Sequence, residues 1–181
     1  VFTVVSIQTT TGYCTSNFDV WPDLAKIVLV SLMFVGGCAG STSGGIKVIR
    51  VWMAIKILMA EIERAFRPKV LRPIKVGSAV IEEDMKRETL VFILGMLIVL
   101  AMGAVIIKLL EQGRCSFTTA ATASVASLCT IGPGLAAVGA IENYGWLTSS
   151  SKLVLSLLMV IGRLELFAIV ALFSPRFWRT D

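Results

Sequence analysis

The sequence predicts an all-α integral membrane protein in which a short helix, a glycine turn and a spanning helix occur twice. Three observations lead to this prediction. The 181 residues are 56% hydrophobic and 16% charged, whereas soluble domains are roughly 45–50% apolar and 25% charged. Two largely apolar runs, residues 90–110 and 153–173, are long enough to cross a bilayer. The turn at residues 10–13, Thr-Thr-Gly-Tyr, has a counterpart at 130–133, Thr-Ile-Gly-Pro.

Residues 1–59 contain a short helix, a turn and one broken membrane traverse. The mostly apolar segment Val1–Gln8 ends at the first turn, an apolar run covers 24–35, and a helical pattern resumes over 46–59. Glycine and serine interrupt this traverse at Gly36, Gly37, Gly40, Ser41, Thr42, Ser43, Gly44 and Gly45. These residues have low helix propensity, and non-helical backbone at membrane depth requires protein or water to satisfy it. We therefore expect a loop inside the membrane.

Residues 60–87 form a polar, basic linker. Seven cations gather there, and membrane spans flank the segment on both sides, which favours a cytoplasmic loop over a nucleic-acid interface. They are Arg64, Arg67, Lys69, Arg72, Lys75, Lys86 and Arg87. A small hairpin is expected over 70–81, around the Gly77-Ser78 turn signal.

Residues 88–181 repeat the first pattern in full. A span over 88–111 precedes residues 116–129, which as a helix would extend only about 21 Å and cannot cross the bilayer. We expect a re-entrant helix there, with Ser116 at its N-cap. A turn at 130–134 then leads through a polar stretch to a second span over 151–173 and a basic, aromatic tail.

Arg163 lies in the middle of this last span. A guanidinium keeps its proton, so at that depth it must face protein, water or an ion pathway. Glu165 points to a different helix face and cannot neutralise it directly. The carbonyl- and hydroxyl-rich loop 36–45 is the expected source of oxygen atoms for its five N–H donors. Arg163 and the loop together would form a gate.

The two turns have the chemistry of a cation filter. Backbone carbonyls from short Thr-x-Gly loops replace the hydration shell of an ion, and glycine allows successive carbonyls to point the same way. In both copies the short helix precedes the turn, so the negative end of its dipole faces the site, as a cation requires. The competing interpretation is that each glycine only ends a helix. The candidate filter residues are Thr10, Thr11, Gly12, Tyr13, Thr130, Ile131, Gly132 and Pro133.

Enzymatic functions find little support. A phosphate-binding loop starting at Gly40 would need lysine where Ile46 stands, and a nucleophile elbow would need serine where Thr42 stands. The chain has no histidine to act as a base or to complete a zinc site with its four cysteines. For the loop itself, a plain flexible break in the helix stays open as an alternative to a gate.

The residues resemble one family, the Trk-type potassium uptake subunits (TrkH), with their Ktr and fungal relatives. The similarity is spread over nearly the whole chain and its motifs are specific in combination, with a tail that favours TrkH over Ktr. The matching stretches are residues 8–13 (QTTTGY), 36–50 (GGCAGSTSGGIKVIR), 132–134 (GPG), 162–167 (GRLELF) and 175–179 (PRFWR).

The resemblance implies four covalently linked M1–P–M2 repeats around one potassium filter. This chain would hold the end of the third repeat, with its broken M2, and the complete fourth. It also implies that K⁺ binds the filter carbonyls, that Ser43 and its neighbours form the gating loop, and that Arg163 contacts this loop. A homodimer, a cytosolic nucleotide-binding subunit (TrkA) and a multi-pass location in the inner membrane are further implications; no organic cofactor is expected in this chain.

The chain begins with Val1 in mid-element, and we expect it to be a fragment that supplies about half the pore and does not conduct alone. The main alternative function is a secondary transporter with discontinuous helices that binds a small solute near the midplane. A non-transporting membrane scaffold is the third possibility.

Overall fold

A computed structural model describes residues 1–41, 43–67, 75–76, 79–80 and 83–164. The described part is mainly helical. In chain order its elements are α1 (Phe2–Gln8), η1 (Phe18–Val20), α2 (Asp23–Val35), α3 (Val48–Phe66), β1 (Lys75–Val76), β2 (Ala79–Val80), α4 (Glu83–Leu110), α5 (Phe117–Leu128), η2 (Ala136–Val138) and α6 (Ser149–Leu164).

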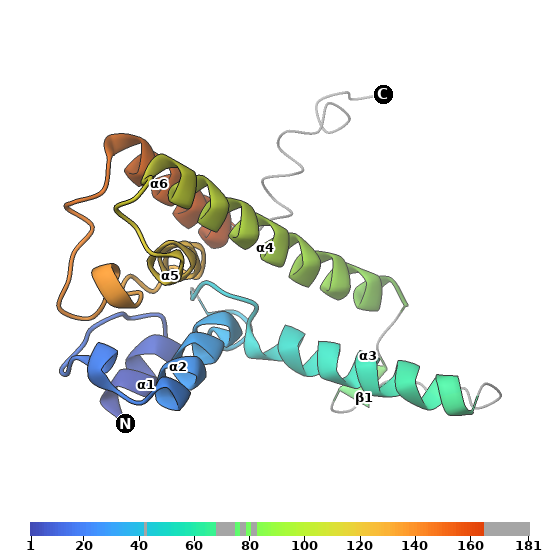
Figure 1. The fold of residues 1–181 in the computed structure, drawn as a ribbon. Coiled ribbons are helices and arrows are strands. Elements are labelled where there is room, and N and C mark those ends of the chain that lie inside the picture. The colour runs from blue at the N-terminus through green and yellow to red at the C-terminus, as the bar shows by residue number, and fades with distance from the viewer. Residues whose placement is uncertain (42, 68–74, 77–78, 81–82, 165–181) are drawn as a thin grey trace, which may run out of the picture.

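Helix α5 lies between the pair α4 and α6 and the pair α1 and α2 (Figure 1). Nine of its twelve residues are buried, and it contributes to both larger apolar clusters, one shared with α4 and α6 and the other with α1 and α2. Its small side chains permit this close packing. The Ser124 hydroxyl donates to the Leu100 carbonyl at 3.2 Å, and a Cβ on Gly103 would lie 2.4 Å from that hydroxyl oxygen.

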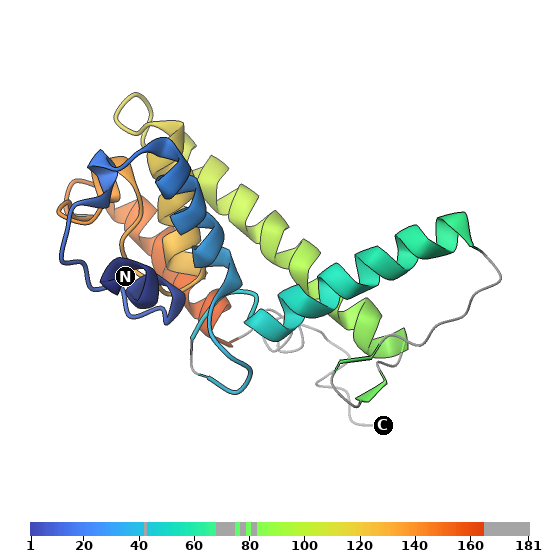
Figure 2. The same cartoon turned by 90° about the horizontal axis from the view of Figure 1, so that it is seen from below.

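Helix α3 and the first half of α4 project from this body as an arm, as both views show (Figures 1 and 2). On α3, Met53 and Ile57 are the buried residues, and the Arg50 guanidinium lies 4.1 Å from the centroid of the Phe92 ring on α4. Many large apolar side chains elsewhere on the described helices are exposed, which suits contact with lipid rather than water.

Two boundaries of the described helices differ from those expected from the sequence. Helix α3 continues to Phe66 and α4 begins at Glu83, so both ends of the predicted linker 60–87 are helical. Ala and Glu, which occur among these helical residues, are strong helix formers. Ion pairs one helical turn apart, Glu61–Arg64 (2.9 Å) in α3 and Glu83–Lys86 (2.6 Å) in α4, further stabilise these helical ends.

Other predictions about single elements can be compared directly. The Ser116 hydroxyl caps α5 by accepting from the Thr119 N–H at 3.1 Å, as predicted. The expected hairpin is present in its central part, where β1 and β2 are antiparallel. Near the end of α4, the Lys108 ammonium donates to the Cys115 carbonyl. Residues 165–173 of the second predicted span and the tail 174–181 lie outside the described residues.

Among the described residues, α4 is the one helix long and apolar enough to cross a membrane, with a hydropathy of 3.1 over its best window. Only 28% of that window is buried inside the protein. The remaining residues are therefore free to face an apolar surrounding, as a lipid-facing helix does.

Candidate functional site

The two glycine turns have the same backbone geometry. The C-cap residue of α1 is Thr9 (φ −83°, ψ 0°), and that of α5 is Cys129 (φ −86°, ψ 3°). The next residues, Thr10 and Thr130, both have positive φ, 57° and 54°, a conformation that threonine rarely adopts. The two turns that the sequence predicts to be counterparts, residues 10–13 and 130–133, therefore also have matching backbone conformations.

The hydrogen bonds of the turns match as well. The Thr11 N–H donates to the Ser6 carbonyl and the Ile131 N–H to the Ala126 carbonyl, each at 2.9 Å. The N–H of the following glycine donates to the same carbonyl in each copy, at 3.3 and 3.4 Å. Each turn thus wraps the C-terminal end of its short helix, where the helix dipole is negative.

The turns touch each other through Gly12. A Cβ at this position would lie 2.0 Å from the Ile131 carbonyl oxygen and 3.1 Å from Cδ of Pro133, and φ is 79°. Only glycine fits both the backbone conformation and the space. Gly132 also has positive φ, 110°, but a Cβ there would meet no atom within 4 Å. The second turn therefore has open space beside its glycine.

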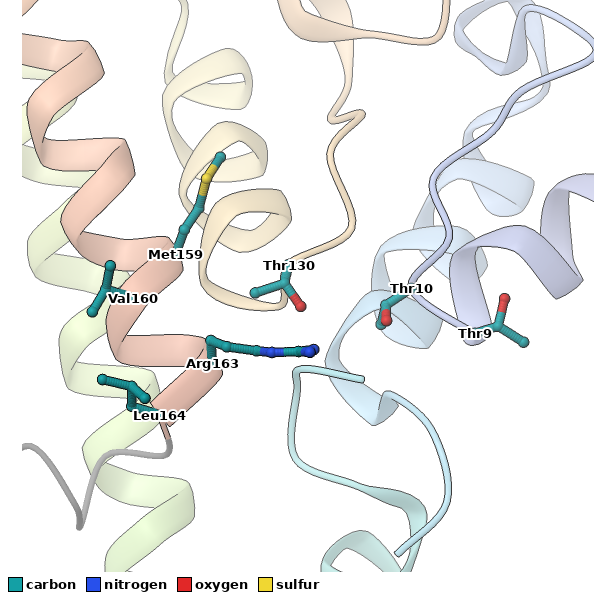
Figure 3. A pocket seen from close by; sticks show the side chains of 7 residues that line it. All are labelled: Thr9, Thr10, Thr130, Met159, Val160, Arg163 and Leu164. Carbon is teal, nitrogen blue, oxygen red and sulfur yellow. The ribbon is translucent and has the colours of Figure 1, made fainter. Parts of the chain in front are cut away.

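A cavity of about 720 Å³ lies beneath the two turns (Figure 3). One threonine of each turn borders it, and the Arg163 side chain extends from α6 toward the gap between them (Figure 3). The lining combines hydroxyl groups with apolar side chains and one cation. It consists of Thr9, Thr10, Thr130, Met159, Val160, Arg163 and Leu164.

The loop between α2 and α3 is closed on itself. The Ser43 hydroxyl accepts from the Gly37 N–H at 2.9 Å and lies 2.9 Å from the Ser41 hydroxyl, which donates to the Cys38 carbonyl at 2.7 Å. At the base of the loop, the Ile46 N–H donates to the Phe34 carbonyl at 2.9 Å. The predicted loop residue Thr42 lies outside the described residues.

The base of this loop contacts the ends of both short helices. The Gln8 side-chain amide at the end of α1 donates to the Gly36 carbonyl. On the other side, a Cβ on Gly44 would lie 2.5 Å from both the Cys129 carbonyl oxygen and the Thr130 hydroxyl oxygen. Sequence reasoning did not single out Gln8 as a site residue, although a polar residue ending a short apolar helix was a visible signal.

Arg163 borders the loop as well as the large cavity. A second cavity of about 210 Å³ is lined by Ser41, Ser43, Gly45, Lys47, Phe92, Gly162 and Arg163. The preceding residue, Gly162, lies against α5, because a Cβ there would stand 1.7 Å from the Leu128 carbonyl oxygen. This close approach sets the position of Arg163 between the turns and the loop.

Residues that were not predicted as site residues hold the second turn and the chain that follows it. The Tyr144 hydroxyl donates to the Gly132 carbonyl at 2.7 Å and the Trp146 indole to the Ala137 carbonyl at 3.0 Å. The Asp19 carboxylate accepts from the Ala136 N–H at 2.8 Å and so joins the two copies. Tyr13, a candidate filter residue, is 74% exposed in the described part of the molecule.

This combination of apolar helices, paired turns at helix C-termini and a broken helix is typical of membrane proteins that handle cations. Residues 1–180 match the TrkH family model, described as a cation transport protein, and the chain belongs to this family. The resemblance seen in the motifs is thereby confirmed.

Relatives with this match are named potassium transporters. The chain is 36% identical over 179 residues to the Trk system potassium uptake protein TrkH of Halomonas elongata and 35% identical over 186 residues to TrkH of Escherichia coli K12. The two alignments include 99% and 98% of this chain but only 36% of each relative. The chain thus spans about a third of their length.

A solved structure supports the same assignment. The crystal structure of the potassium transporter TrkH from Vibrio parahaemolyticus matches with a TM-score of 0.88 and 32% sequence identity. The match covers 98% of this chain and 37% of that chain. The mainly helical fold is therefore that of a TrkH-type membrane protein. Within the described residues, the β-structure consists of the two short strands β1 and β2.

Proposed function

We propose that this chain forms part of a potassium uptake pathway, with the backbone carbonyls of residues 10–13 and 130–133 as two sectors of its selectivity filter. The observation that carries the proposal is the matched geometry of the two turns: positive φ at Thr10 and Thr130, equivalent hydrogen bonds, and contact through Gly12. Carbonyl oxygens at the negative ends of two helices suit a dehydrated monovalent cation. The named relatives are potassium transporters.

The loop over residues 36–45 and Arg163 would form the gate on one side of this filter. Arg163 lines the cavity beneath both turns and also the smaller cavity beside Ser41 and Ser43. A cation moving through the large cavity would pass this fixed positive charge, which opposes its passage. Movement of the loop or of Arg163 would therefore regulate flux.

The remaining sectors of the filter would come from further repeats, since the chain spans about a third of its relatives. In this proposal four M1–P–M2 repeats surround the pathway, with residues 88–111, 116–129 and 151–173 as the fourth. The protein would act as a homodimer in the cytoplasmic membrane, with a TrkA-type nucleotide-binding subunit on the cytosolic side. The 181 residues alone would not conduct.

Rubidium uptake tests the proposal. The 181 residues replace the matching part of V. parahaemolyticus TrkH, and the fusion is expressed in a bacterium that lacks its own potassium uptake. We expect uptake that potassium inhibits and sodium does not, and Gly132→Ser should reduce this selectivity. Uptake whose selectivity is unchanged by the substitution would favour a carrier instead. So would uptake that is saturable and is inhibited by an organic solute. Absence of uptake by a fusion that reaches the membrane would favour a scaffold.

A further inference from the structure

The carbonyl group of Gly132 is held from outside the turn by a phenol. The Tyr144 hydroxyl, twelve residues later in the chain, donates to this oxygen at 2.7 Å. A backbone carbonyl has two lone pairs, so the oxygen accepts from Tyr144 and still has one lone pair for a cation. The direction of the carbonyl therefore depends on the position of the phenol.

Tyr144 is suited to act as a permanent donor. Its ring packs against the apolar cluster around α5, and burial raises the pKa of Tyr144 to about 12. The hydroxyl consequently keeps its proton at any physiological pH and cannot become a competing anion beside the pathway.

The other bonds to this segment have different targets. The Trp146 indole N–H donates to the Ala137 carbonyl at 3.0 Å, and the Thr122 hydroxyl accepts from the Leu135 N–H at 3.0 Å. These groups position the chain after the turn. Tyr144 bonds directly to a carbonyl of the candidate filter, so its effect on an ion is separable from a general effect on the loop.

The two turns differ at this point. In the first copy the equivalent carbonyl, that of Gly12, accepts from the Cys14 thiol at 3.6 Å. A thiol is a weak donor, whereas a phenol is a strong one. The two glycine carbonyls are thus fastened unequally although the backbones of the turns match.

We infer that Tyr144 is a specificity-determining positioning residue, which aims the Gly132 carbonyl at the cation and keeps the second filter sector at a fixed width. The inference rests on the proposed function. A fixed carbonyl favours the larger potassium ion, because it cannot move inward to coordinate sodium. Loss of the phenol oxygen would let the carbonyl turn and would relax the discrimination.

The test compares Tyr144→Phe with Trp146→Phe in the rubidium-uptake fusion. Each substitution removes one hydrogen-bond donor and keeps an aromatic ring, but only the first affects a filter carbonyl. We expect Tyr144→Phe to increase inhibition by sodium about 2- to 10-fold, the factor that corresponds to one ordinary hydrogen bond. Trp146→Phe should leave the ratio of sodium to potassium inhibition unchanged. Equal changes in both variants, or no change in Tyr144→Phe, would overturn the inference.

Hydrogen–deuterium exchange separates this result from failure of the proposed function. If the unsubstituted fusion takes up no rubidium, the pathway proposal fails. The peptide over residues 129–135 still reports on the role of Tyr144, and its amides should exchange about 2- to 10-fold faster in Tyr144→Phe than in Trp146→Phe. Identical exchange in the two variants would show that Tyr144 does not hold the turn.

Discussion

Gly12 lies directly against the carbonyl of Ile131, so the two turns meet at a point where no side chain fits. A Cβ on Gly12 would be 2.0 Å from that oxygen. Residues 119 positions apart in sequence are thereby brought into contact, where the two candidate filter turns adjoin. The second glycine, Gly132, has the same kind of backbone but open space around it. This difference leads to a prediction.

Gly12→Ala should be more damaging than Gly132→Ala. Both alanines must adopt positive φ, which costs about 1–2 kcal/mol, but only the alanine at position 12 also collides with backbone. We expect Gly12→Ala to reduce the amount of folded protein in the membrane and to abolish uptake, while Gly132→Ala folds and changes selectivity. Quantifying folded protein by size-exclusion chromatography in detergent checks this order. Equal yields of the two variants would contradict it.

Gly162 allows α6 to touch the end of α5, and its substitution should displace Arg163. Gly162→Ala places a methyl group 1.7 Å from the Leu128 carbonyl oxygen, so the helices must separate. Overpacking of this kind costs about 1–3 kcal/mol. We expect a lower melting temperature together with altered flux, measured on the same preparation.

The exposed residue Ser156 on the same helix provides the control for Gly162. Ser156→Ala removes a hydroxyl that donates to the Lys152 carbonyl within α6. It should change neither melting nor flux. A Gly162→Ala protein with unchanged melting would show that α5 and α6 can separate at little cost.

Arg163→Ala should raise rubidium leak while selectivity for potassium over sodium stays the same. The side chain borders the cavity beneath the turns and the cavity beside the loop, but it belongs to neither turn. Its removal takes a positive charge from the proposed route and leaves the filter carbonyls in place. Arg163→Lys, which keeps the charge, should leak less. Unchanged flux in Arg163→Ala would exclude the arginine as part of a gate.

Glu111 connects the end of α4 to the start of α6. Its Oε1 accepts from the Thr148 N–H and from the Thr148 hydroxyl, each at 2.7 Å, and the residue is 1% exposed. The hydrogen bond from the Thr148 N–H is the main reason why the pKa of Glu111 is lowered, with burial opposing it. The carboxylate thus stabilises the folded state when ionised.

Acid should therefore weaken this connection. Because the folded pKa is below the unfolded value of about 4.3, the stabilisation is present above that pH and is lost as pH falls through the lower, folded pKa. Glu111→Gln should lower the melting temperature at pH 7 and make melting less dependent on pH below about 5. The exposed Glu142→Gln serves as control. An unaltered acid dependence in Glu111→Gln would contradict the assignment.

Local patterns predicted the elements well where one period or one residue type dominates. The apolar run of α4, the Ser116 cap and the break between α2 and α3 depend on neighbouring residues, and each is present. The end of α3 was predicted too early because Glu61, Glu63 and Arg64 introduce charge into residues 60–66. Polarity indicates exposure, but an exposed segment of good helix formers remains helical.

An apolar chain, two Thr-x-Gly turns after short helices and an arginine in a membrane-length run are all legible in the amino-acid sequence. These features follow from composition and local spacing. By contrast, the contact of Gly12 with Ile131 and the hydrogen bonds from Gln8 to Gly36 and from Tyr144 to Gly132 become apparent once the helices are packed. Such contacts join residues that are distant along the chain or face each other across a loop, and they depend on how whole helices pack, which no local pattern specifies.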